Sequence, residues 1–129
     1  MNPPILANRG HSPVLCSNRT MPHFTVRADV VYNLDDFGLG SVHGTSALRT
    51  TTRALGSAHP VGHHVTNIVI TSIDDRTARV RSKGIAIEAD GSAGSVVYDD
   101  IVTQQPEGWK ISYRKVSARR APLGGQPAP

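Results

Sequence analysis

The sequence predicts an α+β fold in which a curved, mostly antiparallel sheet packs around a single helix. Three observations carry this prediction. Four segments with alternating apolar and polar residues follow one another after residue 62, separated by short turn-forming stretches. A strand-like segment, 28–34, precedes one helical pattern at 45–56. Polar residues are mixed into both faces of the alternating segments, which indicates a sheet that borders a pocket.

The first elements follow from local composition. The segment ADVVYNL, 28–34, is rich in strand-forming residues and ends at the turn-prone pair Asp35-Asp36. The glycine-rich stretch 37–44 indicates a loop or a short hairpin return. For the helix over 45–56 we expect Thr45 or Ser46 as N-cap and Gly56 as the end. We expect this helix to pack on the concave face of the sheet.

The remaining strands are expected at 63–73, 78–89, 94–104 and 109–120, as an antiparallel meander with short connections. Alternation along the third of them places Asp99 and Asp100 on opposite faces, so that one is solvated and the other internal. On the last strand, Trp109, Ile111 and Tyr113 fall on a single face. That apolar face predicts a homodimer formed through the outer face of the sheet.

The 129 residues fit one domain. Three prolines and no periodicity make residues 1–22 an irregular segment, residues 23–121 form the ordered body, and the Pro/Gly-rich residues 122–129 are an expected disordered tail. The net charge is +4, but no helix presents a basic stripe and no aromatics interleave to stack bases, so nucleic acid is not the expected partner.

Cysteine usage and hydropathy bear on location. Cys16 is the single cysteine, so an internal disulfide is excluded and a reducing, cytoplasmic setting is expected. We find neither the apolar core of a signal peptide nor a run of about 20 apolar residues, and no membrane association is predicted.

Histidines cluster in the stretch HPVGHHVTN, 59–67. Pro60 and Gly62 disfavour helix, so His59 and His63 cannot form the helical pair of a metalloprotease. Past Gly62 the pattern is that of a strand, in which adjacent His63 and His64 point to opposite faces. A metal site would need these imidazoles to converge, so neither a metal nor another cofactor is predicted.

Strict alternation along this strand puts His64, Thr66, Ile68 and Ile70 on one face, which we take as the inner one. A histidine there is either a hydrogen-bonded core residue or a general base. Asp100, which shares its face with Tyr98 and Val102, is the expected partner of His64.

The chain resembles the nuclear-transport-factor-2-like superfamily. The resemblance rests on ADVVYNL at 28–34, a glycine-punctuated loop, Gly44 before the helix, HVTN at 64–67, YDD at 98–100 and EGWKISYRKV at 107–116. Within that superfamily these motifs resemble the SnoaL-like polyketide cyclase branch and the small subunits of ring-hydroxylating dioxygenases. The resemblance covers roughly residues 24–120. It implies a cone-shaped, cystatin-like α+β fold with a strongly bent sheet around one helix.

Site residues follow from the resemblance position by position. Asp100 is similar to the pocket aspartate of ketosteroid isomerases, and His59 to a water-positioning histidine of scytalone dehydratase. The isomerase base would fall at Leu34, one residue from Asp35, and such an offset reverses the face of a strand. Members of the superfamily begin with about two helices, whereas residues 1–22 carry no helical pattern.

Two functions remain open. The first is an acid–base isomerase, dehydratase or cyclase acting on a hydrophobic polyketide- or steroid-like molecule. His64, Asp100 and His59 would be its catalytic residues, and Tyr32, Thr66, Tyr98 and Asp35 would bind the ligand. The second is a non-catalytic pocket or dimerisation module like the dioxygenase small subunits. For Tyr32 a core role is the alternative to lining the cavity.

Overall fold

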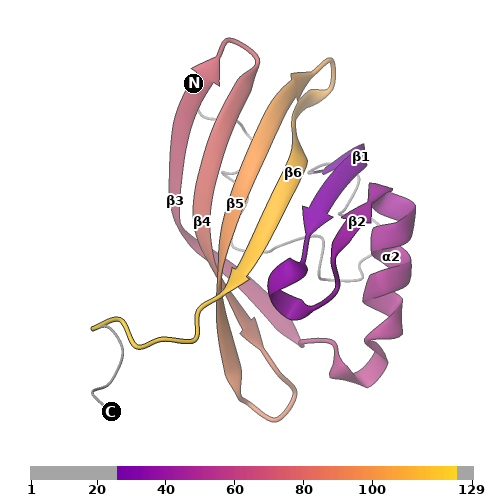
Figure 1. Ribbon diagram of the computed structural model, residues 1–129, viewed down its shortest axis with the longest axis vertical. Helices are drawn as coiled ribbons and strands as arrows, with labels where there is room; N and C mark the ends of the chain where they lie inside the picture. Colours follow the sequence, from indigo (N-terminus) through magenta and orange to yellow (C-terminus); the bar gives the residue numbers. More distant parts are fainter. Residues whose placement is uncertain (1–25, 125–129) are drawn as a thin grey trace.

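A computed structural model describes residues 26–124, and all structural statements below concern that range. Its strands form one mixed sheet in the order β2-β1-β6-β5-β4-β3, with one longer helix (Figure 1). The elements, in chain order, are β1 (Val26–Asn33), the 3-10 helix η1 (Asp35–Phe37), β2 (Ser41–His43), α2 (Gly44–Ala54), the 3-10 helix η2 (Gly56–Ala58), β3 (Gly62–Asp74), β4 (Thr77–Ile87), β5 (Ala93–Gln105) and β6 (Gly108–Ala118).

The predicted α+β class and the antiparallel meander of β3 to β6 are confirmed. The glycine-rich stretch 37–44 forms the expected hairpin return, because β2 pairs antiparallel with β1. The connection that strand-by-strand patterning did not predict is the one between β1 and β6. These two strands pair in parallel, which joins the start of the body to its end and makes the sheet mixed.

Helix α2 lies beside β1 and β2 at one side of the sheet (Figure 1). The helix packs chiefly against β1. The prediction that it packs on the concave face of the meander is therefore wrong in detail. Leu48 and Thr52, one turn apart, are its buried residues. The hydroxyls of the three consecutive threonines, Thr50, Thr51 and Thr52, each donate to the carbonyl four residues earlier, at 2.9 to 3.2 Å.

Both ends of α2 differ slightly from the expected range, since the helix runs from Gly44 to Ala54 rather than over 45–56. His43, rather than Thr45 or Ser46, occupies the N-cap, and no side chain caps the first turn. At the other end Gly56 has φ +52°, a left-handed conformation that glycine adopts without strain, and the α-helix stops before it. The predicted helix is therefore confirmed, with its start shifted by one residue.

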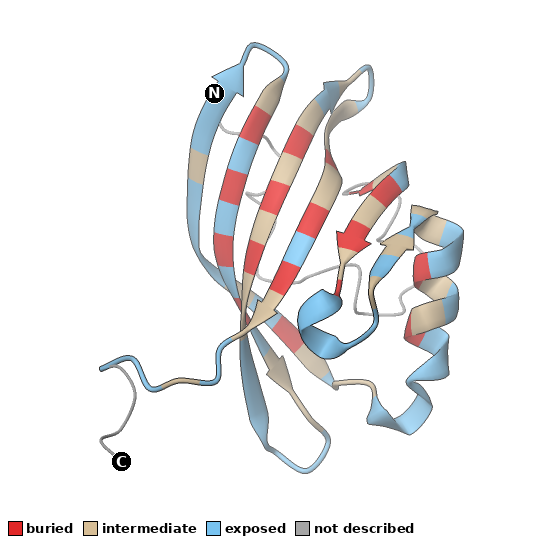
Figure 2. Ribbon diagram, viewed as in Figure 1, coloured by how far each residue is buried: buried red, intermediate tan, exposed pale blue. Residues whose placement is uncertain are grey.

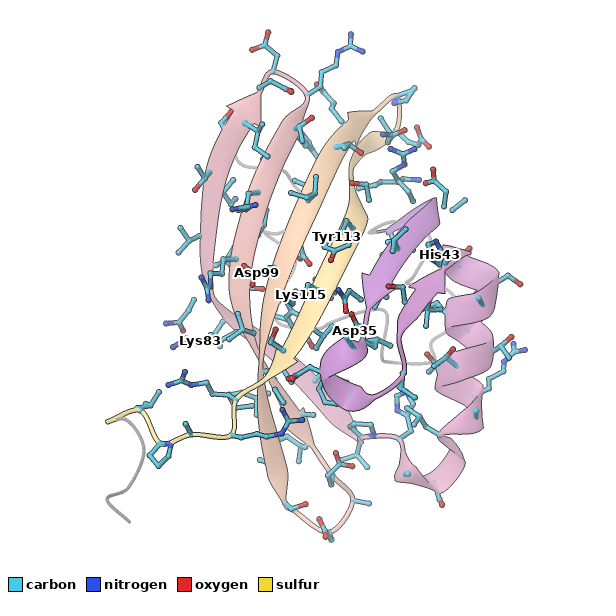
Figure 3. All side chains as sticks on the ribbon, in the orientation of Figure 1. Asp35, His43, Lys83, Asp99, Tyr113 and Lys115 are labelled. Carbon is cyan, nitrogen blue, oxygen red and sulfur yellow. The ribbon has the colours of Figure 1, made fainter. Side chains whose placement is uncertain are left out.

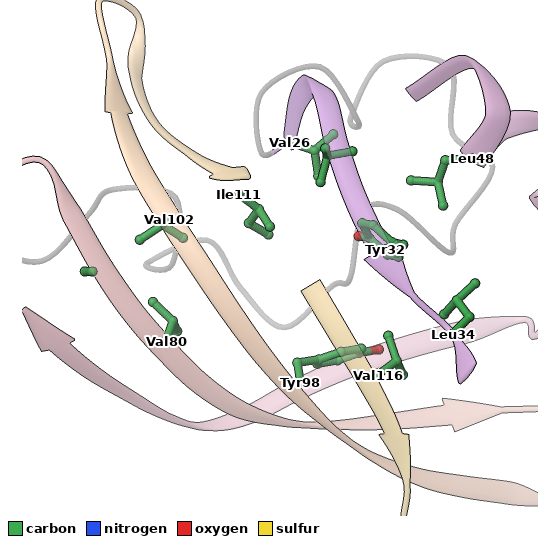
Figure 4. Packing of buried hydrophobic residues seen from close by; sticks show 11 residues of the cluster. Val26, Tyr32, Leu34, Leu48, Val80, Tyr98, Val102, Ile111 and Val116 are labelled. Carbon is green, nitrogen blue, oxygen red and sulfur yellow. The ribbon is translucent and has the colours of Figure 1, made fainter. Parts of the chain in front are cut away.

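The core lies on the inner face of the sheet, where buried positions alternate with exposed ones along β4 and with half-buried ones along β5 (Figure 2). It includes Val80 on β4, Tyr98 and Val102 on β5, and Ile111 on β6. Figure 4 shows Tyr32 and Tyr98 within this apolar cluster. The cluster also contains Val26 from β1 and Leu48 from α2. The outer face of the sheet carries a mixture of polar residues, such as Arg81 and Lys83, and apolar ones, such as Val69 and Val97.

Irregular pairing at two places changes which side chains face the core. In β3 the register shifts between Thr66 and Val69, and Asn67 there has φ +54°. In β5 and β6 the register shifts between Ile101 and Val102, opposite Ser112. An extra residue in one strand bends it and re-aims the side chains that follow. Both shifts contradict the strict alternation used to assign faces from the sequence.

Candidate functional site

The inner face of the sheet carries a buried ion pair between neighbouring strands. The guanidinium of Arg114 on β6 donates from Nε and Nη2 to the two carboxylate oxygens of Asp100 on β5, both at 2.7 Å. Their side chains are 5% and 0% exposed. The prediction that one of Asp99 and Asp100 is internal is confirmed, since Asp99 lies on the outer face near Arg81.

This ion pair sits in one cross-strand row of the inner face. The paired residues of that row, from β3 to β2, are Ile70, Val80, Asp100, Arg114, Tyr32 and Val42. Parallel pairing of β1 with β6 brings Tyr32 beside Arg114. Residues from both halves of the chain therefore meet on one line, which no local sequence pattern could show.

Two tyrosines flank the guanidinium. Its central carbon lies 4.1 Å from the ring centroid of Tyr98 and 5.8 Å from that of Tyr32. Both distances fall within the range of cation–π attraction. The Tyr98 ring extends over Gly84, where an added methyl group would meet the ring at 2.4 Å. Gly84 is thus the residue that makes room for Tyr98.

Burial and charge set the ionisation of this cluster. Burial alone would lower the pKa of Arg114, but the carboxylate of Asp100 outweighs it and holds that pKa well above its ordinary value. Burial raises the pKa of the Tyr32 hydroxyl far above 10, although Arg114 opposes the shift. Near neutral pH the cluster therefore holds a charged guanidinium and a protonated phenol.

The Tyr32 hydroxyl is buried, and no hydrogen-bond partner for it is found among the described residues. A buried hydroxyl without a partner costs free energy, so such groups call for an explanation. This one can donate a hydrogen bond to an oxygen atom of a bound molecule. The Tyr32 side chain lies wholly in the core, at 0% exposure, in agreement with the alternative that Tyr32 is a core residue.

The histidines are placed differently from the expectation. His63, not His64, points inward: it is 3% exposed, and its pairing with Ala86 puts it on the same face as Val80. His64 is exposed and pairs with Ile85 on the outer face. The register shift after Thr66 explains the error, because Ile70 faces inward whereas His64 and Thr66 do not.

The expected pair of His64 with Asp100 is therefore wrong, since the two residues lie on opposite faces of the sheet. Thr66 is exposed on the outer face as well. Asp35 is also exposed, in the first turn of η1, where its backbone N–H donates to the side-chain oxygen of Asn33 at 3.0 Å. Of the predicted ligand-binding residues, Tyr32 and Tyr98 share the inner face with Asp100.

His59 ends η2 and lies next to His63. The two imidazole centroids are 6.3 Å apart with ring planes at 80°. Nδ1 of His59 lies 3.0 Å from the carbonyl oxygen of Pro60, and because a carbonyl only accepts, Nδ1 carries the proton. Nε2 then has a lone pair, and this buried atom has no hydrogen-bond partner among the described residues. It can accept a proton.

Sequence reasoning missed two residues of this arrangement, Arg114 and His63. Arg114 lies among several basic residues near the end of the chain, Lys110, Lys115, Arg119 and Arg120, and this composition alone does not mark it as buried. The signal that could have identified it is an arginine two residues before Val116 on a strand that also carries Ile111, but the bulge at Ser112 hides that spacing. Within residues 26–124 no cluster of three metal-ligating side chains is found.

Comparison with known proteins gives one family. The family described as SnoaL-like domain matches residues 23–115. No match was found among curated proteins. Within residues 26–124 no helix combines the length and apolar character needed to cross a membrane.

Solved structures share the fold. LinA superposes with a TM-score of 0.67 at 14% identity, covering 90% of this chain and 84% of its own. A candidate scytalone dehydratase from Novosphingobium aromaticivorans gives 0.57 at 22% identity, with 74% and 66% covered. A candidate aromatic ring hydroxylase from the same organism gives 0.60 at 25% identity, with 79% and 74% covered. The predicted nuclear-transport-factor-2-like fold is confirmed.

Proposed function

Because the chain belongs to the SnoaL-like domain family, we propose that it is an acid–base enzyme acting on a small hydrophobic molecule, polyketide- or steroid-like, by isomerisation, dehydration or cyclisation. The observation that carries the proposal is the buried Asp100–Arg114 pair beside the buried Tyr32 hydroxyl, whose proton has no acceptor among the described residues. The fold shared with a candidate scytalone dehydratase supports it.

The energetic argument starts from the cost of burial. Taking two ions out of water costs several kcal/mol each, roughly, and apolar residues of similar volume often serve stability as well or better. Here the pair is complete and lies against two aromatic rings. Such a fixed positive charge in a low-dielectric site can stabilise negative charge that develops on a substrate oxygen. Arg114 and Tyr32 are the residues that we assign to this role.

The base in this proposal is an inner histidine rather than His64. His63 is buried on the inner face, and His59 lies at its edge with an accepting Nε2. Tyr98 pairs with Ser82 on β4, and its ring lies over Gly84, which is the next inner position of that strand. The ring therefore extends along the inner face toward the histidines. Tyr98 thus lies between the ion pair and the histidines. We assign proton transfer to His63, which His59 adjoins.

The test is exchange of carbon-bound protons. The protein is incubated in D2O with a panel of hydrophobic ketones of polyketide and steroid type, and deuterium incorporation or loss of water is followed by mass spectrometry. We expect turnover of one class, a loss of about 100-fold or more in His63→Gln, and unchanged turnover in the matched variant His64→Gln. Equal losses in both variants, or no exchange with any compound, would contradict the proposal.

A second function, a non-catalytic dimerisation module, has a separate observation in its favour. The outer face exposes the apolar side chain of Ile85, which pairs with His64 and is 37% exposed. The original basis was a shared face for Trp109, Ile111 and Tyr113, which is wrong because the bulge turns Tyr113 outward while Ile111 is buried inside. The homodimer and the cytoplasmic location stay predictions. Sedimentation equilibrium at micromolar concentration tests the first.

A further inference from the structure

The outer face of the sheet contains a groove of about 400 Å³ on the side away from the ion pair. Outward-facing residues of β3, β4 and β5 form its floor, and the segment that follows β6 borders it. The residues that line the groove include Val69, Arg81, Lys83, Val97, Arg119 and Leu123. Figure 3 labels Lys83 on β4 and shows how the segment after β6 passes below it. The groove thus brings together three stretches of chain.

Strand pairing explains why cations and apolar residues alternate in the groove. Val69 on β3 pairs with Arg81 on β4, and Lys83 on β4 pairs with Val97 on β5. Each cation therefore lies next to an apolar side chain on the neighbouring strand. Val69 and Leu123 are 63% and 84% exposed, so the apolar walls face solvent in this chain.

The third cation is held in place by the backbone. The N–H of Arg119 donates to the carbonyl of Ser95 at 2.8 Å, which fixes the start of the terminal segment beside β5. One residue earlier the N–H of Ala118 donates to a carboxylate oxygen of Asp36 at 2.6 Å. Arg120 forms an ion pair with the same carboxylate at 3.1 Å. These contacts leave Arg119 on the groove side.

The charges of the groove are poorly compensated. Arg81 is 3.8 Å from Asp99 and its side chain is 68% exposed, which makes a weak, solvent-screened pair. Within residues 26–124 neither Lys83 nor Arg119 forms an ion pair. Three cations around an apolar floor therefore face at most one carboxylate.

We propose that this groove binds an amphiphilic anion, a small molecule with one carboxylate on an apolar body. Charge complementarity selects the carboxylate, which arginine can hold with two hydrogen bonds. Val69, Val97 and Leu123 supply the contact for the apolar body. The volume lies within the range of small-molecule sites. This site is distinct from the inner face, and the inference does not rest on the proposed function.

A second copy of the chain is the main alternative occupant of this face. In a two-fold dimer the same patch occurs on both subunits. Stacking one groove on another would place Arg81, Lys83 and Arg119 against their own copies, and like charges disfavour such a contact. The predicted homodimer therefore has to form outside the groove if both are to exist.

The test uses decanoate as the probe, below its micelle-forming concentration, with the full chain labelled with ¹⁵N. We expect decanoate to shift the amide signals around Val69, Lys83 and Arg119. Acetate, which has the charge without the chain, and decyltrimethylammonium, which has the chain with the opposite charge, should each bind at least about tenfold more weakly. Equal binding of the cationic probe would overturn the proposal, and so would shifts confined to the inner face.

Variants separate the groove from non-specific charge. Arg81→Gln combined with Lys83→Gln should weaken decanoate binding about tenfold. Arg79→Gln, which removes a cation from the same face of β4 outside the groove, should not. Leu123→Ser should weaken binding, whereas Ile73→Ser, another exposed apolar residue, should not. Equal effects of the groove variants and their controls would contradict a built site. All five positions are exposed, so folding is expected to be retained.

Discussion

Arg114 and Asp100 face each other across neighbouring strands with two hydrogen bonds of 2.7 Å, and neither side chain reaches solvent to more than 5%. A pair of this kind contributes little net stability when compared with apolar residues, yet each partner depends on the other. Removing one leaves an uncompensated charge in the core. This asymmetry gives the first prediction.

Asp100→Leu or Arg114→Met is expected to lower the free energy of unfolding by about 3–5 kcal/mol. The double variant Asp100→Leu, Arg114→Met should recover most of that loss, because no unpaired charge remains. Urea unfolding of the three variants measures the coupling. A double variant whose loss equals the sum of the single losses would show that the ion pair is not the source of the effect.

The exposed pair of Arg27 and Asp29 is the matched control. It has the same bidentate pattern, with both distances at 2.8 Å, but its side chains are 34% and 69% exposed. Solvent screening reduces such a pair to about 0–1 kcal/mol. Arg27→Gln should therefore leave the unfolding midpoint nearly unchanged.

The Tyr32 hydroxyl gives a prediction about pH. Burial raises the pKa of this phenol in the folded protein above its value of about 10 in the unfolded chain. Above about pH 10 the unfolded chain loses this proton while the folded one keeps it, so the folded state is destabilised as pH rises. Tyr32→Phe should lack this contribution, and comparing urea unfolding of both proteins near pH 8 and near pH 11 measures it.

The same variant also tests whether the hydroxyl has a partner. At neutral pH, Tyr32→Phe should be neutral or stabilising by up to about 1 kcal/mol, because it removes a buried polar group that forms no hydrogen bond among the described residues. A loss of more than about 1 kcal/mol would instead reveal a hydrogen bond to this oxygen.

The sequence predicts the strands and the helix well because their signals are local. Alternation, turn residues and the glycine at position 56 located the α-helix and the five longer strands to within about two residues, but they did not predict the two 3-10 helices. The cone shape of the fold was predicted from the family resemblance, because local sequence patterns do not determine how strongly a sheet bends. The predicted irregular segment 1–22 lies outside the described residues, as does most of the predicted tail.

The candidate site was harder to predict because faces depend on register. One extra residue near Asn67 places His64 and Ile70 on opposite faces of β3. One extra residue near Ser112 likewise places Ile111 and Tyr113 on opposite faces of β6. The sequence did not predict Arg114 as the partner of Asp100 for the same reason, because the register between β5 and β6 determines which residues pair. Tyr32 meets Arg114 only through the parallel contact of β1 and β6, which joins residues far apart in the sequence.

Gly84 provides a test of the packing around Tyr98. A methyl group at this position would meet the Tyr98 ring at 2.4 Å, and that ring is buried beside Arg114. Gly84→Ala is therefore expected to cost about 1–3 kcal/mol of stability. In a Tyr98→Ala background the same change should cost much less, because the clash is gone.

Gly94 is the control for the backbone effect of this substitution. It lies on β5, and a methyl group there would meet nothing within 4 Å. Gly94→Ala should be neutral or slightly stabilising, by up to about 1 kcal/mol. If thermal unfolding shows equal losses for both glycines, the Tyr98 ring does not lie over Gly84.

The last prediction tests the faces of β3 directly. His64 is exposed on the outer face, whereas His63 next to it is 3% exposed on the inner face. Diethylpyrocarbonate, which modifies accessible imidazoles, should therefore react with His64 in the folded protein and with His63 only after urea unfolding. Digestion and fragment mass spectrometry distinguish the neighbouring residues, and His64→Gln confirms the assignment. Faster reaction of His63 in the folded protein would show that β3 runs in the strictly alternating register, and both His63 as the inner base and the outer groove beside Val69 would then be lost.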